Sequence, residues 1–99
     1  MRIEVTGKHV ELTDAIVEYA RAKCEKLTRF YDGLMEIECV LDKAAHNEFT
    51  AEIVCDVVKH ENFVVNARGP DVYACIDQAE DRMARRLRDF KEKLRDNRR

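Results

Sequence analysis

A long stretch of helical periodicity, between residues 70 and 95, decides much of what this 99-residue chain is able to fold into. Apolar residues recur there at intervals of three and four, which places them on one side of a helix. They are Val72, Ile76, Ala79, Met83, Leu87, Phe90 and Leu94. A helix with such a side has to bury it, so the rest of the chain must provide a surface for it to cover.

Two segments with alternating apolar residues predict that surface. The apolar sets are Met35, Ile37, Cys39 and Leu41 in the first, and Phe49, Ala51, Ile53, Cys55 and Val57 in the second. A period of two predicts strands with one buried face. Shorter alternations predict two further strands, over residues 2–6 and 63–67.

A first helix is predicted between the strand over residues 2–6 and the strand that contains residues 35–41. Thr13 is a suitable N-cap with Asp14 behind it, and Gly33 is expected to end the helix in the left-handed conformation. The second helix is expected to begin with Pro70 near its first position or with Asp71 as its cap. The order is therefore βαβββα, which predicts an α+β fold with two helices on one face of a four-stranded sheet.

Charge is distributed unevenly along the chain, although the net charge is only −2. Residues 34–65 contain seven acidic and two basic residues, whereas residues 82–99 contain nine basic and three acidic residues. The acidic residues that share the sheet face away from both helices are Glu36, Glu38, Asp42, Glu52 and Asp56. One surface should repel phosphate while another attracts it.

The candidate binding residues are basic and lie on the two predicted helices. They are Lys23, Lys26 and Arg29 along one edge of the first helix, and Arg82, Arg86 and Lys93 on a common flank of the second, with Arg85 one step round. With both helices on one face, the two edges are expected to form one patch that contacts polyanions. The alternative is a solvated charged face that carries a few salt bridges.

The motif content argues against an enzyme. None of the patterns G-x-x-x-x-G-K-[ST], G-x-G-x-x-G or G-x-S-x-G occurs. The four cysteines form no C-x-x-C pair and are expected to be reduced, and the histidines lie in separate loops, so we expect no metal and no cofactor. The chain also lacks the G-x-x-G loop of KH domains and the aromatic strand of RRM domains. Recognition of structured RNA through shape and phosphate is the mode that remains.

The length predicts a single domain, residues 1–99, because a chain of this size supports one core. No apolar run approaches the ~18 residues of a membrane span, and the N-terminus has no signal-peptide profile. We therefore expect a cytoplasmic protein with neither a membrane partner nor a small-molecule substrate.

Several segments together carry a family resemblance: VELTDAI at residues 10–16, KCEKL at 23–27, DVYACID at 71–77 and DRMARRL at 81–87. Their order and spacing resemble the ribosome hibernation promoting factor and protein Y family over nearly the whole chain. The resemblance implies a βαβββα fold similar to a double-stranded RNA-binding domain. It also implies binding to the small ribosomal subunit, with its 16S rRNA and ribosomal proteins, in the channel used by messenger and transfer RNA. Translation would thereby be silenced in stressed or stationary cells.

The resemblance assigns roles by position. Lys23, Lys26, Arg82, Arg85 and Lys93 match basic sites of the family, and Arg29 matches a variable one. Arg86 stands where a glutamine is usual, and Asp89 stands where a lysine is expected. The chain resembles the short form, or the N-terminal domain of the long form, and is expected to be a monomer when free.

Two other classes of function stay open. The acidic strand face predicts a protein–protein interaction module that recruits a basic partner. A small enzyme would require a pocket with convergent titratable groups, which the sequence does not indicate.

Overall fold

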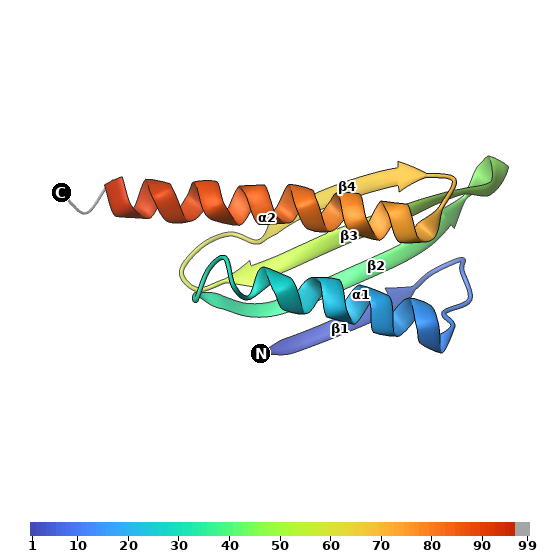
Figure 1. Ribbon diagram of the computed structural model, residues 1–99, viewed down its shortest axis with the longest axis horizontal. Coiled ribbons are helices and arrows are strands. Elements are labelled where there is room, and N and C mark those ends of the chain that lie inside the picture. The colour runs from blue at the N-terminus through green and yellow to red at the C-terminus, as the bar shows by residue number, and fades with distance from the viewer. Residues whose placement is uncertain (97–99) are drawn as a thin grey trace.

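The computed structural model describes residues 1–96, and its element order confirms the predicted βαβββα arrangement. The strands are β1 (Arg2–Gly7), β2 (Leu34–Ala44), β3 (Glu48–Val57) and β4 (Phe63–Gly69). The helices are α1 (Asp14–Leu27) and α2 (Val72–Asp96), and a 3₁₀ turn, η1 (Ala45–Asn47), joins β2 to β3. Both helices lie on the same face of the sheet, as predicted (Figure 1).

The four strands form one sheet in the order β1-β2-β3-β4. β1 is parallel to β2, with α1 as the crossover, and the other two pairs are antiparallel. α1 packs over β1 and β2, whereas α2 packs over β3 and β4 and also contacts α1. The core between the layers is apolar and contains all four free cysteines.

The helix starts follow the predicted capping chemistry. The Thr13 side chain accepts a hydrogen bond from the Ile16 N–H at 3.2 Å, and the Asp71 carboxylate accepts one from the Tyr73 N–H at 3.0 Å. Asp71, and not Pro70, is therefore the cap of α2.

The predicted end of α1 at Gly33 is wrong. The helix ends at Leu27, where the Thr28 hydroxyl donates to the Glu25 carbonyl at 2.8 Å. Among residues 1–96 no glycine has a positive φ, so Gly33 does not supply a left-handed cap. A Cβ at Gly33 would overlap the Tyr31 ring, which packs against Phe90. The reason for a glycine here is therefore the close approach of a side chain.

The buried face of β2 differs from the prediction at its first residues. Met35 was expected in the core but is 55% exposed, whereas Leu34 is 7% exposed. Leu34 pairs with Val57 and Glu36 pairs with Asp56, so Met35 is the additional residue of a β-bulge. The bulge reverses the alternation at the start of the strand. From Ile37 onward the predicted core residues of β2 are buried.

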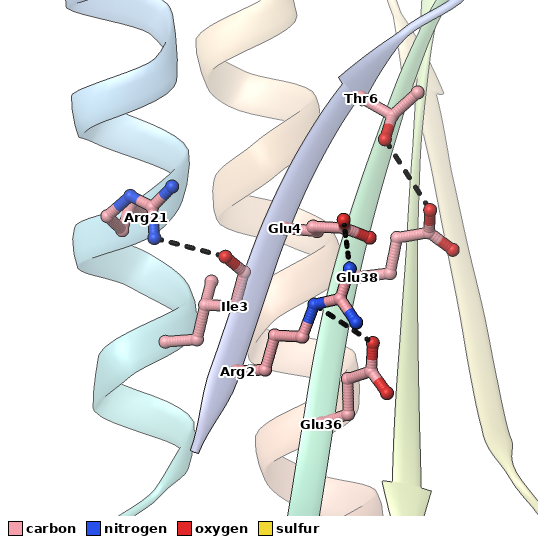
Figure 2. A network of polar contacts seen from close by, with 7 residues as sticks. All are labelled: Arg2, Ile3, Glu4, Thr6, Arg21, Glu36 and Glu38. Atoms are coloured by element: carbon pink, nitrogen blue, oxygen red, sulfur yellow. Dashed lines mark hydrogen bonds and ion pairs between the residues drawn. The ribbon is translucent and has the colours of Figure 1, made fainter.

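Arginines on the helices bond to the carbonyls of both edge strands. Arg21 on α1 donates from Nη1 to the Ile3 carbonyl of β1 at 3.0 Å, as Figure 2 shows. Arg82 and Arg86 on α2 donate to the carbonyls of Asn66 and Val64 on β4, the latter at 3.2 Å. These bonds fix three guanidinium groups against the sheet.

The opposite face of the sheet is acidic, as predicted. Glu36 lies directly across from Asp56, and one side chain, Arg2, partly compensates by pairing with Glu4 at 2.7 Å and with Glu36 at 3.7 Å (Figure 2). The face points away from both helices. Within residues 1–96, no helix combines the length and the apolar character that crossing a bilayer requires.

Candidate nucleic-acid interface

The seven basic residues predicted from the sequence lie on or directly after the two helices. Lys23 and Lys26 are on α1, Arg29 is in the turn that follows it, and Arg82, Arg85, Arg86 and Lys93 are on α2. All are exposed except Lys23, whose side chain is 23% exposed. Their surroundings divide them into groups with different freedom to bind a ligand.

Arg82 and Arg86 lie on the flank of α2 that faces β4. Their bonds to the Asn66 and Val64 carbonyls hold both guanidinium groups beside the edge of the sheet. Arg86 also lies over the Phe63 ring, with its guanidinium carbon 4.8 Å from the ring centroid. Each guanidinium has five N–H donors, so most of them remain for an external acceptor.

Lys23, on α1, lies against the opposite flank of α2, in the contact between the two helices. Its ammonium is 3.2 Å from Asp77, which also accepts a hydrogen bond from the Tyr19 hydroxyl at 2.6 Å. The hydrogen bond to Asp77 raises the pKa of Lys23. Burial opposes ionisation of Asp77, but the bonds from Tyr19 and Lys23 outweigh it and lower its pKa. The charge of Lys23 is thus largely compensated inside the protein.

The basic residues of α2 are spread over more than one side of the helix. At about 100° per residue, Arg82 and Arg86 lie roughly 140° and 180° round α2 from Asp77. One flank faces β4 and the other faces α1, with the helix between them. Arg85 is exposed on the outward side and connects the two flanks.

Arg88 completes this surface and is absent from the residues chosen from the sequence. Its guanidinium carbon lies 5.5 Å from the ring centroid of Phe30, a residue in the turn after α1. By helical rotation it is about 60° from Arg85, on the side away from Arg82. Ala84, four residues earlier on the same side of α2, is 6% exposed. A small apolar residue within this charged segment is the sequence signal that another element packs against that flank.

The charged surface is mostly free of internal ion pairs. Of the seven residues predicted from the sequence, only Lys23 pairs with an acidic side chain among residues 1–96. Residues 82–95 contain seven basic and two acidic residues. Salt bridges within residues 1–96 therefore compensate little of the charge on this surface.

The first half of α2 has the opposite character. Glu80 is 9% exposed, and burial raises the pKa of its carboxyl group. Among residues 1–96, no three His, Cys, Asp or Glu side chains gather as metal ligands would. The basic interface is accordingly confined to the second half of α2 and the end of α1.

A protein-family comparison identifies the chain. Residues 3–95 match the family model described as Sigma 54 modulation protein / S30EA ribosomal protein. The chain belongs to this family. The resemblance to the ribosome hibernation promoting factors and protein Y is thereby confirmed.

Curated relatives of this S30EA family member are ribosome hibernation promoting factors. That of Escherichia coli (strain K12) is 34% identical over 99 residues, covering 95% of this chain and 97% of the relative. That of Pseudomonas putida is 28% identical over 93 residues, covering 94% of this chain and 89% of the relative.

Two solved structures share the fold of this chain. The N-terminal domain of Thermus thermophilus protein Y is 34% identical and superimposes with a TM-score of 0.80, covering 91% of this chain and 99% of that domain. A ribosomal subunit interface protein from Coxiella burnetii also has a TM-score of 0.80 at 19% identity, which supports the fold alone.

Proposed function

We propose that this protein is a ribosome hibernation factor that binds the small ribosomal subunit and inhibits translation under stress or in stationary phase. The observation that carries the proposal is the match to the Escherichia coli hibernation promoting factor over almost the full length of both chains. The proposed docking surface is the basic half of α2 together with the end of α1. It would occupy the channel for messenger and transfer RNA.

The physical basis of this binding is the release of counterions from rRNA phosphates. Each Lys or Arg that neutralises a phosphate releases counterions and makes the affinity steeply dependent on salt. Residues 82–95 of α2 extend about 20 Å along the helix axis, long enough to follow several phosphates. Arg82 and Arg86 are already held by β4, so their ordering on binding costs less side-chain entropy.

The proposal includes 16S rRNA and ribosomal proteins as contacts, and a cytoplasmic location. The protein acts as one domain over residues 1–99, is a monomer when free, and needs no catalytic step because occupying the channel is sufficient.

A ribosome pelleting assay over a series of salt concentrations tests the proposal. Arg85→Glu should weaken pelleting with small subunits, and more so at higher salt, because Arg85 is exposed and carries no ion pair among residues 1–96. Lys43→Glu is the matched control, since it makes the same charge change at the end of β2 far from the C-terminal half of α2 (Figure 1). Equal pelleting of the two variants would contradict the proposed surface.

The acidic sheet face supports a second candidate function, the recruitment of a basic protein. Glu36 and Asp56 lie directly opposite each other, and like charges at such positions are unfavourable unless something compensates for them. Binding through this face should be lost on neutralising Glu36 and should not depend on Arg85.

A further inference from the structure

An open hollow lies beside the C-terminal half of α2, at the turn that joins β3 to β4. Its volume is about 600 Å³, within the range of small-molecule sites. The lining includes His60, Phe63, Arg86, Phe90, Lys93 and Leu94. The hollow exists because α2 continues past the start of β4, so its last turns project beyond the sheet (Figure 1).

Three rings line this hollow. The ring centroid of His60 is 4.7 Å from that of Phe63 and 4.6 Å from that of Phe90, and the two phenylalanine rings are 5.1 Å apart. Phe63 is 4% exposed and forms the floor, whereas His60 is exposed and Phe90 is half-buried. The His60 Nδ1 lies 2.8 Å from the Glu61 carbonyl oxygen. Since a carbonyl oxygen can only accept, Nδ1 is the donor, and this hydrogen bond fixes the orientation of the ring.

Two cations stand at the rim. Arg86 is held over Phe63 at 4.8 Å and bonds to the Val64 carbonyl with one of its nitrogens. Lys93, two turns further along α2, is exposed and has no ion pair among residues 1–96. Asp89 lies between them in sequence and also lines the hollow.

This combination selects a ligand with a flat apolar part and a negative part. A lipid tail would leave the cations unused, and a bare phosphate would leave the rings unused. A nucleotide uses both, because every base has a π-face that stacks on aromatic side chains and its phosphate pairs with Arg or Lys. A carboxylate at the rim is suited to accept a hydrogen bond from an exocyclic amino group of a base.

We propose that this hollow binds one unstacked nucleotide, with the base against His60 and Phe90 and the phosphate against Arg86 and Lys93. The nucleotide comes either from a single-stranded segment of RNA or from the free pool. The RNA source rests on the proposed function, and would add a base contact to a surface that otherwise contacts phosphates. The free source does not depend on ribosome binding.

The test is titration of the ¹⁵N-labelled protein with adenosine, adenosine monophosphate and a six-residue oligoadenylate, followed by NMR. The monophosphate or the oligonucleotide should shift the resonances of residues at the hollow. His60→Ala should weaken that binding roughly tenfold, since removing one aromatic side chain on which a base stacks lowers the affinity by about this factor. Lys93→Ala should remove the preference for the monophosphate over adenosine. His9→Ala, an exposed histidine paired with Asp42 on the far side of the sheet, is the matched control and should bind normally.

The same spectra report whether each variant is folded, and Phe90→Leu provides a second test that preserves apolar volume. Shifts with the oligonucleotide alone identify RNA as the source, and equal affinity for the monophosphate identifies the free pool. Absence of shifts at the hollow with both ligands, or equal affinities of His60→Ala and His9→Ala, would overturn the inference. Ribosome pelleting is measured in parallel, so a protein that pellets but binds no nucleotide at the hollow refutes this site and leaves the proposed function standing.

Discussion

Arg82 and Arg85 are three residues apart on α2, yet their contacts differ, and alanine substitutions should separate their contributions. Arg82 donates to the Asn66 carbonyl, whereas Arg85 has no hydrogen bond or ion pair of its side chain among residues 1–96. Alanine is a strong helix former, so neither substitution weakens α2 itself. Any loss of stability in Arg82→Ala therefore reports its contact with β4.

The size of this effect follows from the kind of bond that is lost. A hydrogen bond at an exposed strand edge contributes about 1 kcal/mol to the free energy of unfolding. In a domain of this size, 1 kcal/mol corresponds to roughly 4–8 °C in Tm. Thermal unfolding should thus show a decrease of that order for Arg82→Ala, and a shift less than about half as large for Arg85→Ala.

Ribosome binding should respond to both substitutions alike, because each variant loses one phosphate contact. Each should reduce the magnitude of the log–log salt slope by roughly 0.7–0.9. Reversing both charges together should abolish pelleting while circular dichroism still shows the helices. An unchanged Tm for Arg82→Ala would mean that the bond to β4 contributes nothing in solution. An unchanged salt slope for Arg85→Ala would remove the outward side of α2 from the docking surface.

Three further predictions concern other parts of the molecule. Cys39 and Cys55 should resist thiol reagents in the native protein. Burial raises the pKa of Cys55 to about 12, and a hydrogen bond with Cys24 together with burial raises the pKa of Cys39. Rapid labelling of both cysteines before unfolding would contradict the packing of the sheet. Substituting Glu36 and Glu52 by Gln should leave the dissociation rate from ribosomes nearly unchanged and alter at most the salt-dependent association rate. Severalfold faster dissociation would indicate that the sheet face makes contacts of its own. Asp77→Asn should cost less than about 1 kcal/mol at pH 7, because the pair is partly exposed. Since the folded pKa of Asp77 is lowered, the stabilisation is complete above the unfolded pKa of about 3.9 and is lost as pH falls through the folded value, so urea unfolding of the two proteins should converge at acidic pH.

The element order could be predicted because it depends on local periodicity and capping chemistry. Thr13 and Asp71 cap the helices with their own side chains, and alternation from Ile37 onward fixes which face of β2 is buried. Met35 could not be placed, because a bulge arises from the pairing of β2 with β3 and not from the sequence of β2 alone. The end of α1 was missed for a similar reason, since Gly33 meets a ring whose position depends on Phe90.

The sequence could place the candidate basic residues on the two helices, but it could not show how they are arranged against their neighbours. Periodicity placed Arg82 and Arg86 on one flank of α2, yet it could not tell which neighbour that flank faces. Only the packed structure turns it toward β4 and pairs Lys23 with Asp77. Arg88 could not be selected from the sequence, because its position depends on contact with the Phe30 ring from the turn after α1.

The arginine bonds to the outer strands bear on how copies of this protein behave when crowded together. An open sheet grows by adding a strand from another chain to its unpaired backbone groups, and that is a common route to aggregation. Arg21 at one margin and Arg82 with Arg86 at the other occupy acceptors that such a strand would need. Two of these three side chains also belong to the proposed RNA surface. The same arginines would therefore keep copies of the protein from joining edge to edge and, in the proposed function, also contact phosphate.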